Sequence, residues 1–273
     1  MTKLLGVLGD PVSHSLSPVI HSHWIREAGL DATYEALRVA PDEFNLALET
    51  LSTRDCVGFN VTLPHKTAAF GASALLSDAA QAIGAVNTLT LQDNGAWHGH
   101  NTDASGFLDA LDRQNIAPKP ETKVIVIGAG GAARAVVYAL SSIDVLPLIL
   151  NRSEAKARQL SIDLTGSEAA YGSIDYLYGR AAEADLIINT VSLGHEGKIL
   201  NLPRVENGIF ADISYGHAAA DQLAHASEQG WTTHDGLQML VSQAAHSFET
   251  WFNIAPQTDE ILSRCRTLLE TVT

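Results

Sequence analysis

Short apolar runs alternate with longer amphipathic stretches along most of this chain. A short run rich in β-branched residues is typical of a strand buried in a sheet. Apolar residues that recur every three or four positions are typical of a helix. Because the two patterns alternate, the chain is predicted to belong to the α/β class, with helices packed against sheets.

The individual elements follow from this pattern and from the turn residues that bound it. The predicted strands are Leu4–Leu8, Thr33–Leu37, Cys56–Val61, Lys123–Ile127, Leu148–Leu150, Leu186–Asn189 and Ile209–Ile213. The predicted helices are Ser17–Ala28, Pro41–Leu51, Ala104–Gln114, Ala132–Ser141, Glu154–Leu164, Leu237–Thr250 and Ile261–Leu269. A hairpin is predicted to begin within Ala85–Leu91 and to turn at Asp93-Asn94-Gly95. Ser17 is predicted to cap the first helix. Pro147 is predicted to be the first residue of the strand that contains Leu148–Leu150.

A glycine-rich turn joins the predicted strand Lys123–Ile127 to the helix after it. Gly128 permits a tight turn, Gly130 lets backbone amides approach a pyrophosphate, and Ala133 allows close packing of helix on strand. The helix N-terminus adds unpaired N–H groups and the positive end of the helix dipole. This order of strand, turn and helix predicts a dinucleotide-binding site in the middle of the chain.

The residues after the next predicted strand indicate which dinucleotide binds. From Gly128 to Asn151 is 151 − 128 = 23 positions, close to where an NAD site has an acidic residue for the ribose 2′-hydroxyl. Arg152, Ser153 and Lys156 follow instead, and their cations and hydroxyl suit a 2′-phosphate. The pattern favours NADP, with a surface arginine at the start of a helix as the alternative.

Two polar segments before the glycine turn contain candidate catalytic residues. Asn60 and Thr62 lie at the end of one predicted strand and Lys66 follows, at the edge where open α/β sheets bind ligands. Asp103 precedes the helix predicted to begin at residue 104. A lysine beside a carboxylate can hold a substrate hydroxyl and transfer its proton, so Lys66 and Asp103 form a candidate pair. Taken singly, a surface lysine and a helix-capping aspartate explain these two residues equally well.

The loop after the first predicted strand, Gly9–Pro18, is a candidate anion site. The hydroxyls of Ser15 and Ser17, with the free N–H groups of the first helical turn, could hold a carboxylate. Simple capping by Ser17 is the alternative, and both can hold at once because the cap does not need Ser15.

Composition narrows the range of partners. The 273 residues include 31 acidic and 17 basic side chains, a formal net charge of −14, so no nucleic-acid partner is expected. No apolar run approaches the roughly 20 residues of a membrane span, so no membrane partner is expected. Cys56 and Cys265 are too few and too far apart for a disulfide framework, and no secretory signal is recognised. We therefore expect a cytoplasmic protein.

Two histidine pairs were considered as metal ligands. His21 with His23, and His98 with His100, are spaced for one face of a strand. Neither pair is accompanied by a third ligand or a cysteine pair, so no metal site is expected.

Taken together, these motifs resemble those of the shikimate dehydrogenase family from Gly9 to about Phe248. The matching segments are Gly9–His21, Asn60–Lys66, Gly84–Thr88, Asn101–Asp103, Gly128–Arg134 and Asp235–Ala245. The resemblance implies reversible NADP-linked reduction of 3-dehydroshikimate to shikimate, on the route to chorismate and the aromatic amino acids. It also implies two α/β domains: a substrate domain of residues 1–103 completed by 238–273, and a Rossmann-type NADP-binding domain of residues 104–237.

The resemblance further implies roles for individual residues. Lys66 and Asp103 would be the catalytic pair and would also contact the substrate. The other substrate-binding residues would be Ser15, Ser17, Asn60, Thr62, Asn87, Tyr215 and Gln243. The phosphates of the cofactor would be bound by Gly128, Ala129, Gly130, Gly131, Ala132, Asn151, Arg152, Ser153 and Lys156. The nicotinamide would lie near Ile213, Gly236, Met239 and Asp78.

The chain departs from the family pattern in places that leave the catalytic pair untouched. Ala104 stands where glycine is usual, Asn189–Gly194 only partly matches a cofactor loop, and the segment after Tyr215 lacks the usual proline and threonine. Two alternatives are a quinate/shikimate dehydrogenase with dual substrates or NAD use, and a non-catalytic NADP-sensing module. Apart from the small-molecule substrate, the expected partner is at most a second copy, as a monomer or homodimer.

Overall fold

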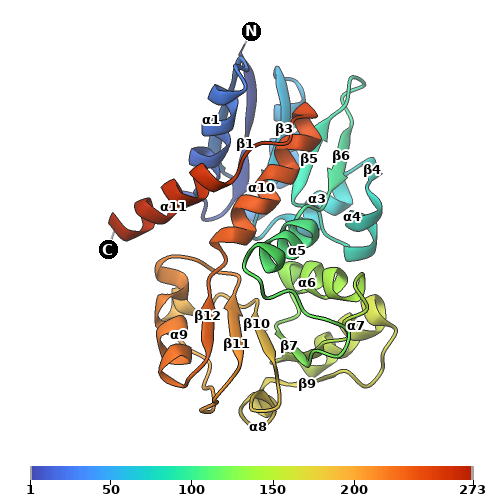
Figure 1. Ribbon diagram of the computed structural model, residues 1–273. Coiled ribbons are helices and arrows are strands. Elements are labelled where there is room, and N and C mark those ends of the chain that lie inside the picture. Colours follow the sequence, from blue (N-terminus) through green and yellow to red (C-terminus); the bar gives the residue numbers. More distant parts are fainter. Residues whose placement is uncertain (1, 272–273) are drawn as a thin grey trace. The chain divides into compact units, whose positions relative to one another are not determined.

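The computed structural model describes residues 2–271, apart from the side chains of residues 195 and 196. The chain forms two compact units, each with a six-stranded sheet and its own helices (Figure 1). One unit comprises Met1–Gly106 and Leu240–Leu268, and the other Phe107–Met239 and Leu269–Thr273. The α/β class is confirmed. A search of the described helices finds none with the length and apolar character needed to cross a membrane.

The first unit is built on a mixed sheet with the strand order β2-β1-β3-β5-β6-β4. Its strands are β1 (Lys3–Gly9), β2 (Ala32–Arg38), β3 (Cys56–Val61), β4 (Leu75–Leu76), β5 (Thr88–Leu91) and β6 (Trp97–His100). Its helices are α1 (Ser17–Glu27), η1 (Pro41–Glu43), α2 (Phe44–Ser52), α3 (Lys66–Ala72) and α4 (Asp78–Ile83). The first unit also includes the start of α5 (Asp103–Arg113), most of α10 (Leu237–Phe252) and most of α11 (Asp259–Thr271). Strands β1, β2 and β3 are parallel, whereas β5 is antiparallel to both β3 and β6, which confirms the predicted hairpin.

The second unit is built on a fully parallel sheet. Its strands are β7 (Val124–Ile127), β8 (Leu148–Asn151), β9 (Tyr171–Ser173), β10 (Leu186–Asn189), β11 (Ile209–Asp212) and β12 (Thr232–His234). Its helices are α6 (Gly131–Ser141), α7 (Glu154–Thr165), η2 (Ile174–Tyr176), α8 (Leu177–Ala181), η3 (Leu193–Glu196) and α9 (His217–Glu228). The order β9-β8-β7-β10-β11-β12 is that of a doubly wound nucleotide-binding sheet, whose ligands bind where the order reverses, between β7 and β10.

Each unit has its own apolar core, and the strand sequences explain why. All four residues of β7 are buried, as are all four of β10, which is typical of parallel strands covered on both faces. In the first unit, Phe59 and Leu89 come from neighbouring strands and are fully buried, and the Phe59 ring meets Trp97 edge to face. The candidate site residues follow the ends of strands that are packed in these cores.

Two local predictions need correction or refinement. The prediction that Ser17 caps α1 is wrong, because Leu16 occupies the cap position and makes no side-chain cap hydrogen bond. The helix already includes Ser17, whose N–H donates to Ser15 Oγ at 3.2 Å. Pro147 lies just before β8 rather than in it, so the missing N–H of the proline interrupts no strand hydrogen bond.

The unit boundaries fall within helices. The chain passes between the units after Gly106, in α5, and after Met239, in α10. The sequence predicts the two domain boundaries after residues 103 and 237. It also assigns the whole C-terminal segment to the substrate domain, whereas Leu269–Thr273 group with the second unit.

Candidate active site

The loops after β1 and β3 meet because these strands are parallel neighbours whose carboxyl ends share one sheet edge. Asp10 N–H donates to the Leu63 carbonyl at 3.0 Å, and Thr62 N–H donates to the Leu8 carbonyl at 2.9 Å. Lys66 then opens α3, and its carbonyl accepts from Val86 N–H at 3.0 Å. The backbone around Lys66 is therefore held on both sides.

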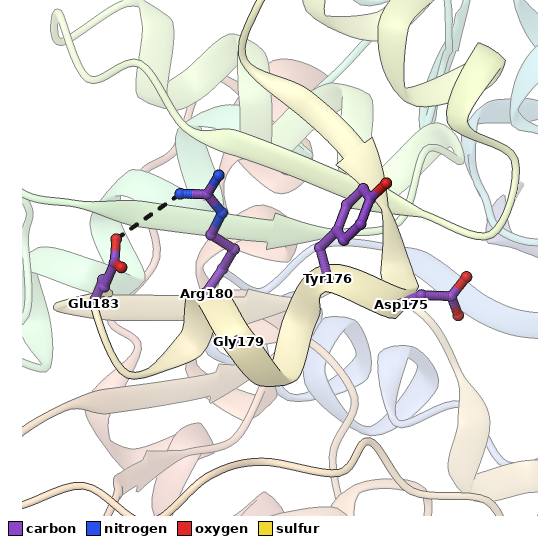
Figure 2. Close-up of a pocket in the computed structure, with 5 residues that line it drawn as sticks. All are labelled: Asp175, Tyr176, Gly179, Arg180 and Glu183. Atoms are coloured by element: carbon purple, nitrogen blue, oxygen red, sulfur yellow. Dashed lines mark ion pairs between the residues drawn. The ribbon is translucent and has the colours of Figure 1, made fainter.

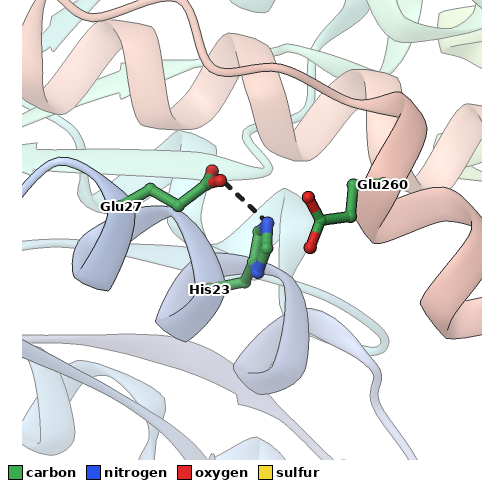
Figure 3. Close-up of side chains that lie close together, drawn as sticks. All are labelled: His23, Glu27 and Glu260. Atoms are coloured by element: carbon green, nitrogen blue, oxygen red, sulfur yellow. Dashed lines mark ion pairs between the residues drawn. The ribbon is translucent and has the colours of Figure 1, made fainter.

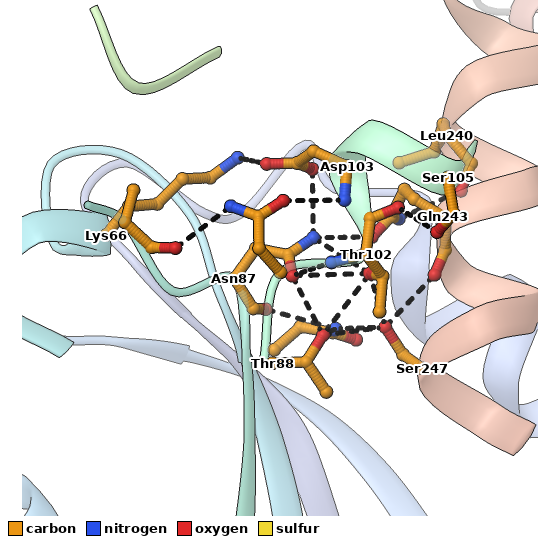
Figure 4. Close-up of polar contacts among 12 residues, drawn as sticks. Lys66, Asn87, Thr88, Thr102, Asp103, Ser105, Leu240, Gln243 and Ser247 are labelled. Atoms are coloured by element: carbon orange, nitrogen blue, oxygen red, sulfur yellow. Dashed lines mark hydrogen bonds and ion pairs between the residues drawn. The ribbon is translucent and has the colours of Figure 1, made fainter. Parts of the chain in front are cut away.

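Lys66 and Asp103 form a close ion pair in the first unit (Figure 4). Lys66 Nζ lies 2.5 Å from Asp103 Oδ2, and the two side chains are 17% and 8% exposed. Asp103 is the first residue of α5, and its N–H donates to Asn101 Oδ1 at 3.1 Å. Because the Asp103 carboxylate bonds to Lys66 and Asn87, helix capping does not describe it.

Asn87 holds the second oxygen of this carboxylate. Its side chain is buried, and Nδ2 donates to Asp103 Oδ1 at 2.9 Å and to Thr102 Oγ1 at 3.0 Å. Gln243 Oε1 lies 3.3 Å from the same Nδ2. Asn87 Oδ1 accepts from the Thr102 N–H at 2.8 Å. One amide therefore fixes both the start of α5 and the orientation of the Asp103 carboxylate.

A fully buried layer of hydroxyls and amides lies behind Asn87 (Figure 4). Ser247 Oγ lies 2.8 Å from Thr88 Oγ1 and 3.1 Å from Thr102 Oγ1. Asn60 Nδ2 donates to Ser247 Oγ at 2.9 Å, and Asn60 Oδ1 accepts from the Tyr34 hydroxyl at 2.7 Å. The Asn60 side chain therefore hydrogen-bonds within this layer. Asn87 is the residue that connects the layer to the Asp103 carboxylate.

The sequence interpretation missed Ser247, Thr88 and Thr102. Thr88 and Thr102 stand inside segments that were singled out, although no role was given to them. The signal for Ser247 is its position four residues after Gln243, which puts both on one face of α10. Ser247 Oγ donates to the Gln243 carbonyl at 3.0 Å.

The approach of α10 depends on a glycine. A methyl group at Gly106, on α5, would lie 2.5 Å from Gln243 N and 2.6 Å from Gln243 Cα. Such distances are shorter than any van der Waals contact, so only glycine allows these backbones to come so close. This approach places Gln243 and Ser247 beside Asn87.

An aromatic cluster lies next to the buried polar layer. The His21 ring stacks on Tyr34 with centroids 4.3 Å apart and contacts the rings of Trp24 and Trp251. Burial lowers the pKa of His21 to about 3, because the charged imidazolium loses its hydration. Burial raises the pKa of Tyr34 well above its ordinary value for the same reason. Both side chains are neutral near pH 7.

The remaining first-unit candidates lie at the loop edges. Ser15 is partly buried and Ser17 is buried, and they are adjacent through the hydrogen bond from Ser17 N–H. Thr62 is partly buried at the end of β3. Asp78 is exposed in the first turn of α4, which Ser77 caps through its side chain.

In the second unit, the glycine turn joins β7 to the N-terminus of α6. Gly128 has a φ of 117°, and a methyl group there would collide with Thr190 Oγ1. Gly130 occupies the cap position of α6 without a side-chain cap hydrogen bond, and a methyl group on it would meet no atom within 4 Å. Ala129, Gly131 and Ala132 complete the turn and the first helical residues. The helix N-terminus therefore presents backbone to open space, which fits an anion.

The polar residues after β8 lie on the same unit. Asn151 ends the strand, and its Nδ2 donates to the Ser153 carbonyl at 3.0 Å. Arg152, Ser153 and Lys156 are exposed. Two cations at the end of β8 can attract a phosphate despite the acidic composition of the whole chain.

The second unit contains three of the four residues expected near the nicotinamide, whereas the fourth, Asp78, lies in the first unit. The Ile213–Tyr215 segment follows β11, and Gly236 N–H donates to the Ser214 carbonyl at 2.8 Å. Met239 lies one turn further along the chain, in α10, and is buried. Tyr215 is partly buried in this unit, whereas Gln243, assigned to the same substrate, is in the first unit.

Asp212 supports this segment, and the sequence interpretation did not single it out. Its Oδ1 accepts from Ser214 N–H at 2.8 Å, and its Oδ2 accepts from Asn189 Nδ2 at 2.7 Å. Burial raises the pKa of this carboxyl group above its ordinary value. An acidic residue at the end of a buried strand is the signal that could have found it.

A surface hollow on the second unit lies apart from these groups of residues (Figure 2). It is lined by residues of η2, α8 and the segment just after α8: Asp175, Tyr176, Gly179, Arg180 and Glu183. Arg180 and Glu183 form a long ion pair of 4.0 Å between exposed side chains. None of the residues expected to bind substrate or cofactor lines it.

Family models match the chain over three segments. Residues 7–89 match the shikimate dehydrogenase substrate binding domain, and residues 111–217 match shikimate / quinate 5-dehydrogenase. Residues 236–266 match the shikimate 5′-dehydrogenase C-terminal domain.

Individual relatives are similar over almost the whole chain. The shikimate dehydrogenase (NADP(+)) of Hyphomonas neptunium is 46% identical over 270 residues, 99% of each protein. That of Rhizobium rhizogenes is 39% identical, over 94% of this chain and 91% of the relative. Among solved structures, the shikimate dehydrogenase of Aquifex aeolicus has a TM-score of 0.86 at 32% identity, covering 96% of this chain and 97% of its own. Shikimate 5-dehydrogenase of Thermus thermophilus in complex with NADP(H) and shikimate has a TM-score of 0.85 at 32% identity, covering 97% and 99%.

Proposed function

The chain belongs to the shikimate dehydrogenase family, and on that premise we propose that Lys66 and Asp103 catalyse reversible NADP-linked reduction of 3-dehydroshikimate to shikimate. Membership makes the chain an NADP-dependent oxidoreductase of the shikimate pathway. The proposal adds the direction of the reaction, its reversibility and the residues that carry it out.

The observation that carries the proposal is the 2.5 Å contact between Lys66 Nζ and Asp103 Oδ2. During reduction, Lys66 as an ammonium group donates a proton to the carbonyl oxygen of the substrate. In the reverse direction its neutral amine accepts the hydroxyl proton. Asp103 orients Nζ, and Asn87 in turn orients Asp103 through its other carboxylate oxygen. In this proposal, Lys66 Nζ is the atom that donates and accepts the proton.

The second unit supplies the cofactor site in this proposal. NADPH, when bound, provides the hydride. The turn from Gly128 to Ala132 would hold the pyrophosphate, which is supported by the tight turn at Gly128 and by the open space beside Gly130. Asn151, Arg152, Ser153 and Lys156 would hold the adenosine phosphate, since two of them are exposed cations. The nicotinamide is proposed to lie near Ile213, Gly236, Met239 and Asp78.

Substrate binding is proposed for the polar residues to which the family resemblance assigns it. Ser15 and Ser17 would bind the carboxylate, supported by their adjacency at the start of α1. Thr62, Asn87, Gln243 and Tyr215 would hold the ring hydroxyls. Asn60 was expected among these residues, and its buried contacts with Tyr34 and Ser247 support an indirect contribution through the layer behind Asn87.

A steady-state assay tests the function. Purified full-length protein is given shikimate or quinate with NADP⁺ or NAD⁺, and reduction of the cofactor is followed by absorbance. We expect turnover with shikimate and NADP⁺, and a lower kcat/KM in each of the other three combinations. Equal use of quinate or NAD⁺ would favour the dual-substrate alternative. No turnover in any combination would contradict the proposal and favour an NADP-sensing module.

The Lys66→Ala variant tests the assigned chemistry. It should lower kcat by about a hundredfold or more, because general acid–base catalysis contributes about that much. NADP⁺ affinity, measured by calorimetry, should stay unchanged because Lys66 belongs to the first unit. Lys119→Ala, at an exposed lysine of the link before β7, is the matched control and should keep wild-type kcat. Wild-type turnover by Lys66→Ala would show that another group transfers the proton.

We also propose that the protein works in the cytoplasm as a monomer or homodimer. Its two cysteines, Cys56 and Cys265, are free and buried, so its fold uses no disulfide between them. Light scattering of the purified protein measures the oligomeric state, and a mass above that of a dimer would contradict this proposal.

A further inference from the structure

In the first unit, helix α1 contacts the start of helix α11. The residues of this contact do not include the proposed catalytic pair. Trp24 Nε1, on α1, donates to the Gln257 carbonyl at 2.8 Å, just before α11 begins. Beside this contact, His23 and Glu27 from α1 converge with Glu260 from the first turn of α11 (Figure 3). His23 and Glu27 share one helix face because they are four residues apart.

The three side chains present ligand atoms to one another. His23 Nε2 lies 3.3 Å from Glu27 Oε2, and the ligand atoms of all three residues lie within 4.8 Å of one another. The His23 side chain is only 9% exposed, and its buried Nε2 makes the ion-pair contact with Glu27 but no hydrogen bond among the described residues. A buried polar atom without a hydrogen bond is unfavourable, and a metal ion at this centre would satisfy it.

The chemistry of the set selects a metal ion. Two carboxylates and an imidazole nitrogen can each direct a lone pair toward their common centre, the imidazole once its Nε2 carries no proton. A tetrahedral ion with bonds of about 2.1 Å separates its ligand atoms by roughly 3.4 Å, close to the His23–Glu27 distance. Glu260 needs only a side-chain adjustment to reach the same centre, and it is exposed enough to make one.

We propose that His23, Glu27 and Glu260 bind one Zn²⁺ ion, with water as the fourth ligand. The imidazole nitrogen favours zinc over Mg²⁺ and Ca²⁺, which prefer oxygen ligands. The bound ion ties α11 to α1 and stabilises the folded first unit, because it binds the native arrangement of residues 237 positions apart, from 260 − 23. It does not take part in the proposed proton transfer.

The sequence predicts no metal site, because it pairs His23 with His21 and offers no third ligand for that pair. His21 and His23 are two residues apart, a spacing that shares a face on a strand but not on a helix. In α1 the His21 ring instead stacks on Tyr34. The true neighbours of His23 are Glu27, one turn away, and Glu260 on another helix.

Calorimetric titration of the chelator-treated full-length protein with ZnCl₂ tests the site. We expect one saturable Zn²⁺ site per chain and a higher melting temperature with Zn²⁺. Glu260→Gln and Glu27→Gln, both at partly or fully exposed carboxylates, should each weaken Zn²⁺ affinity at least tenfold while the protein stays folded. Co²⁺ in place of Zn²⁺ should give visible absorption bands typical of tetrahedral coordination.

Two control variants distinguish this site from adventitious binding. Glu249→Gln removes an exposed carboxylate elsewhere on the first unit, and His98→Gln breaks the second histidine pair, whose rings lie 4.0 Å apart. Both should bind Zn²⁺ as the wild type does. The proposal is overturned if the wild type has no saturable site, if Glu260→Gln binds as tightly as the wild type, or if His98→Gln alone abolishes binding.

Discussion

Asn87 connects the two layers of the proposed active site through one side-chain amide. Its Nδ2 contacts the Asp103 carboxylate, and its Oδ1 accepts from Thr102 N–H. Behind it, Thr88 Oγ1 donates to Asn87 Oδ1 at 3.0 Å, and Ser247 Oγ lies 2.8 Å from Thr88 Oγ1. Because a buried amide must satisfy both its donors and its acceptor, this network allows the carboxylate few other orientations.

At the same scale, His21 should make stability depend on pH. Its pKa is lowered from 6.5 to about 3 in the folded state, so only the unfolded chain binds this proton between those values. Stability therefore falls as pH decreases from about 6.5, with a slope of up to about 1.4 kcal/mol per pH unit from this residue. His21→Phe should flatten the dependence between pH 4 and 6.

Chemical denaturation at a series of pH values measures this effect. Phenylalanine keeps an aromatic ring against Tyr34 and Trp24 but cannot be protonated. The slope difference between wild type and variant is the informative quantity, since all other titrating groups are shared. Identical slopes would mean that His21 is already charged or exposed in the native protein.

At the scale of elements, the approach of α10 to α5 decides where Gln243 and Ser247 lie. Gly106→Ala would place a methyl group 2.5 Å from Gln243 N, so the helices would have to separate. Overpacking of this kind costs about 1–3 kcal/mol. We expect lower stability in denaturant and a higher KM for shikimate, because Gln243 would move away from Asn87.

Gly71→Ala provides a matched control on α3. A methyl group at Gly71 would meet no atom within 4 Å, and alanine is a better helix former than glycine. This variant should be neutral or about 0.5–1 kcal/mol more stable, with KM unchanged. Equal effects of the two substitutions would contradict the importance of the close approach.

The sequence predicted elements with a strong apolar pattern better than elements without one. Strand β10 has the predicted bounds, and α7 differs by one residue at its end, because each has a strong apolar pattern. Helices α3, α4, α8 and α9 and strands β4, β9 and β12 were not predicted. Apart from α9, these elements have two to seven residues and lack a continuous apolar run, so tertiary contacts stabilise them instead.

At the scale of the whole molecule, an acidic protein must bind an anionic cofactor. The net charge of −14 repels NADP⁺, so binding depends on local groups: the backbone at the start of α6 and the exposed cations after β8. Under the proposed assignment, Arg152 and Lys156 are the groups whose charge would distinguish a 2′-phosphate from a hydroxyl.

Thermal unfolding with each cofactor measures this preference. NADP⁺ at about 100 times its Kd should stabilise the folded protein by about 2.7 kcal/mol and raise Tm, because it binds only the folded chain. NAD⁺ at the same concentration should raise Tm less. Arg152→Ala should reduce the NADP⁺ shift and leave the NAD⁺ shift unchanged. Equal shifts by the two cofactors in the wild type would contradict the assignment of Arg152.

The sequence by itself determined the α/β class, the glycine turn and the candidates Lys66 and Asp103, because apolar periodicity and turn chemistry are local properties. Only the tertiary structure decided which distant side chains meet. It placed Ser247 behind Asn87, moved Ser17 from the cap into the helix, and brought Glu260 to His23. Such contacts depend on how helices pack across a sheet, and spacing along a chain does not specify that packing.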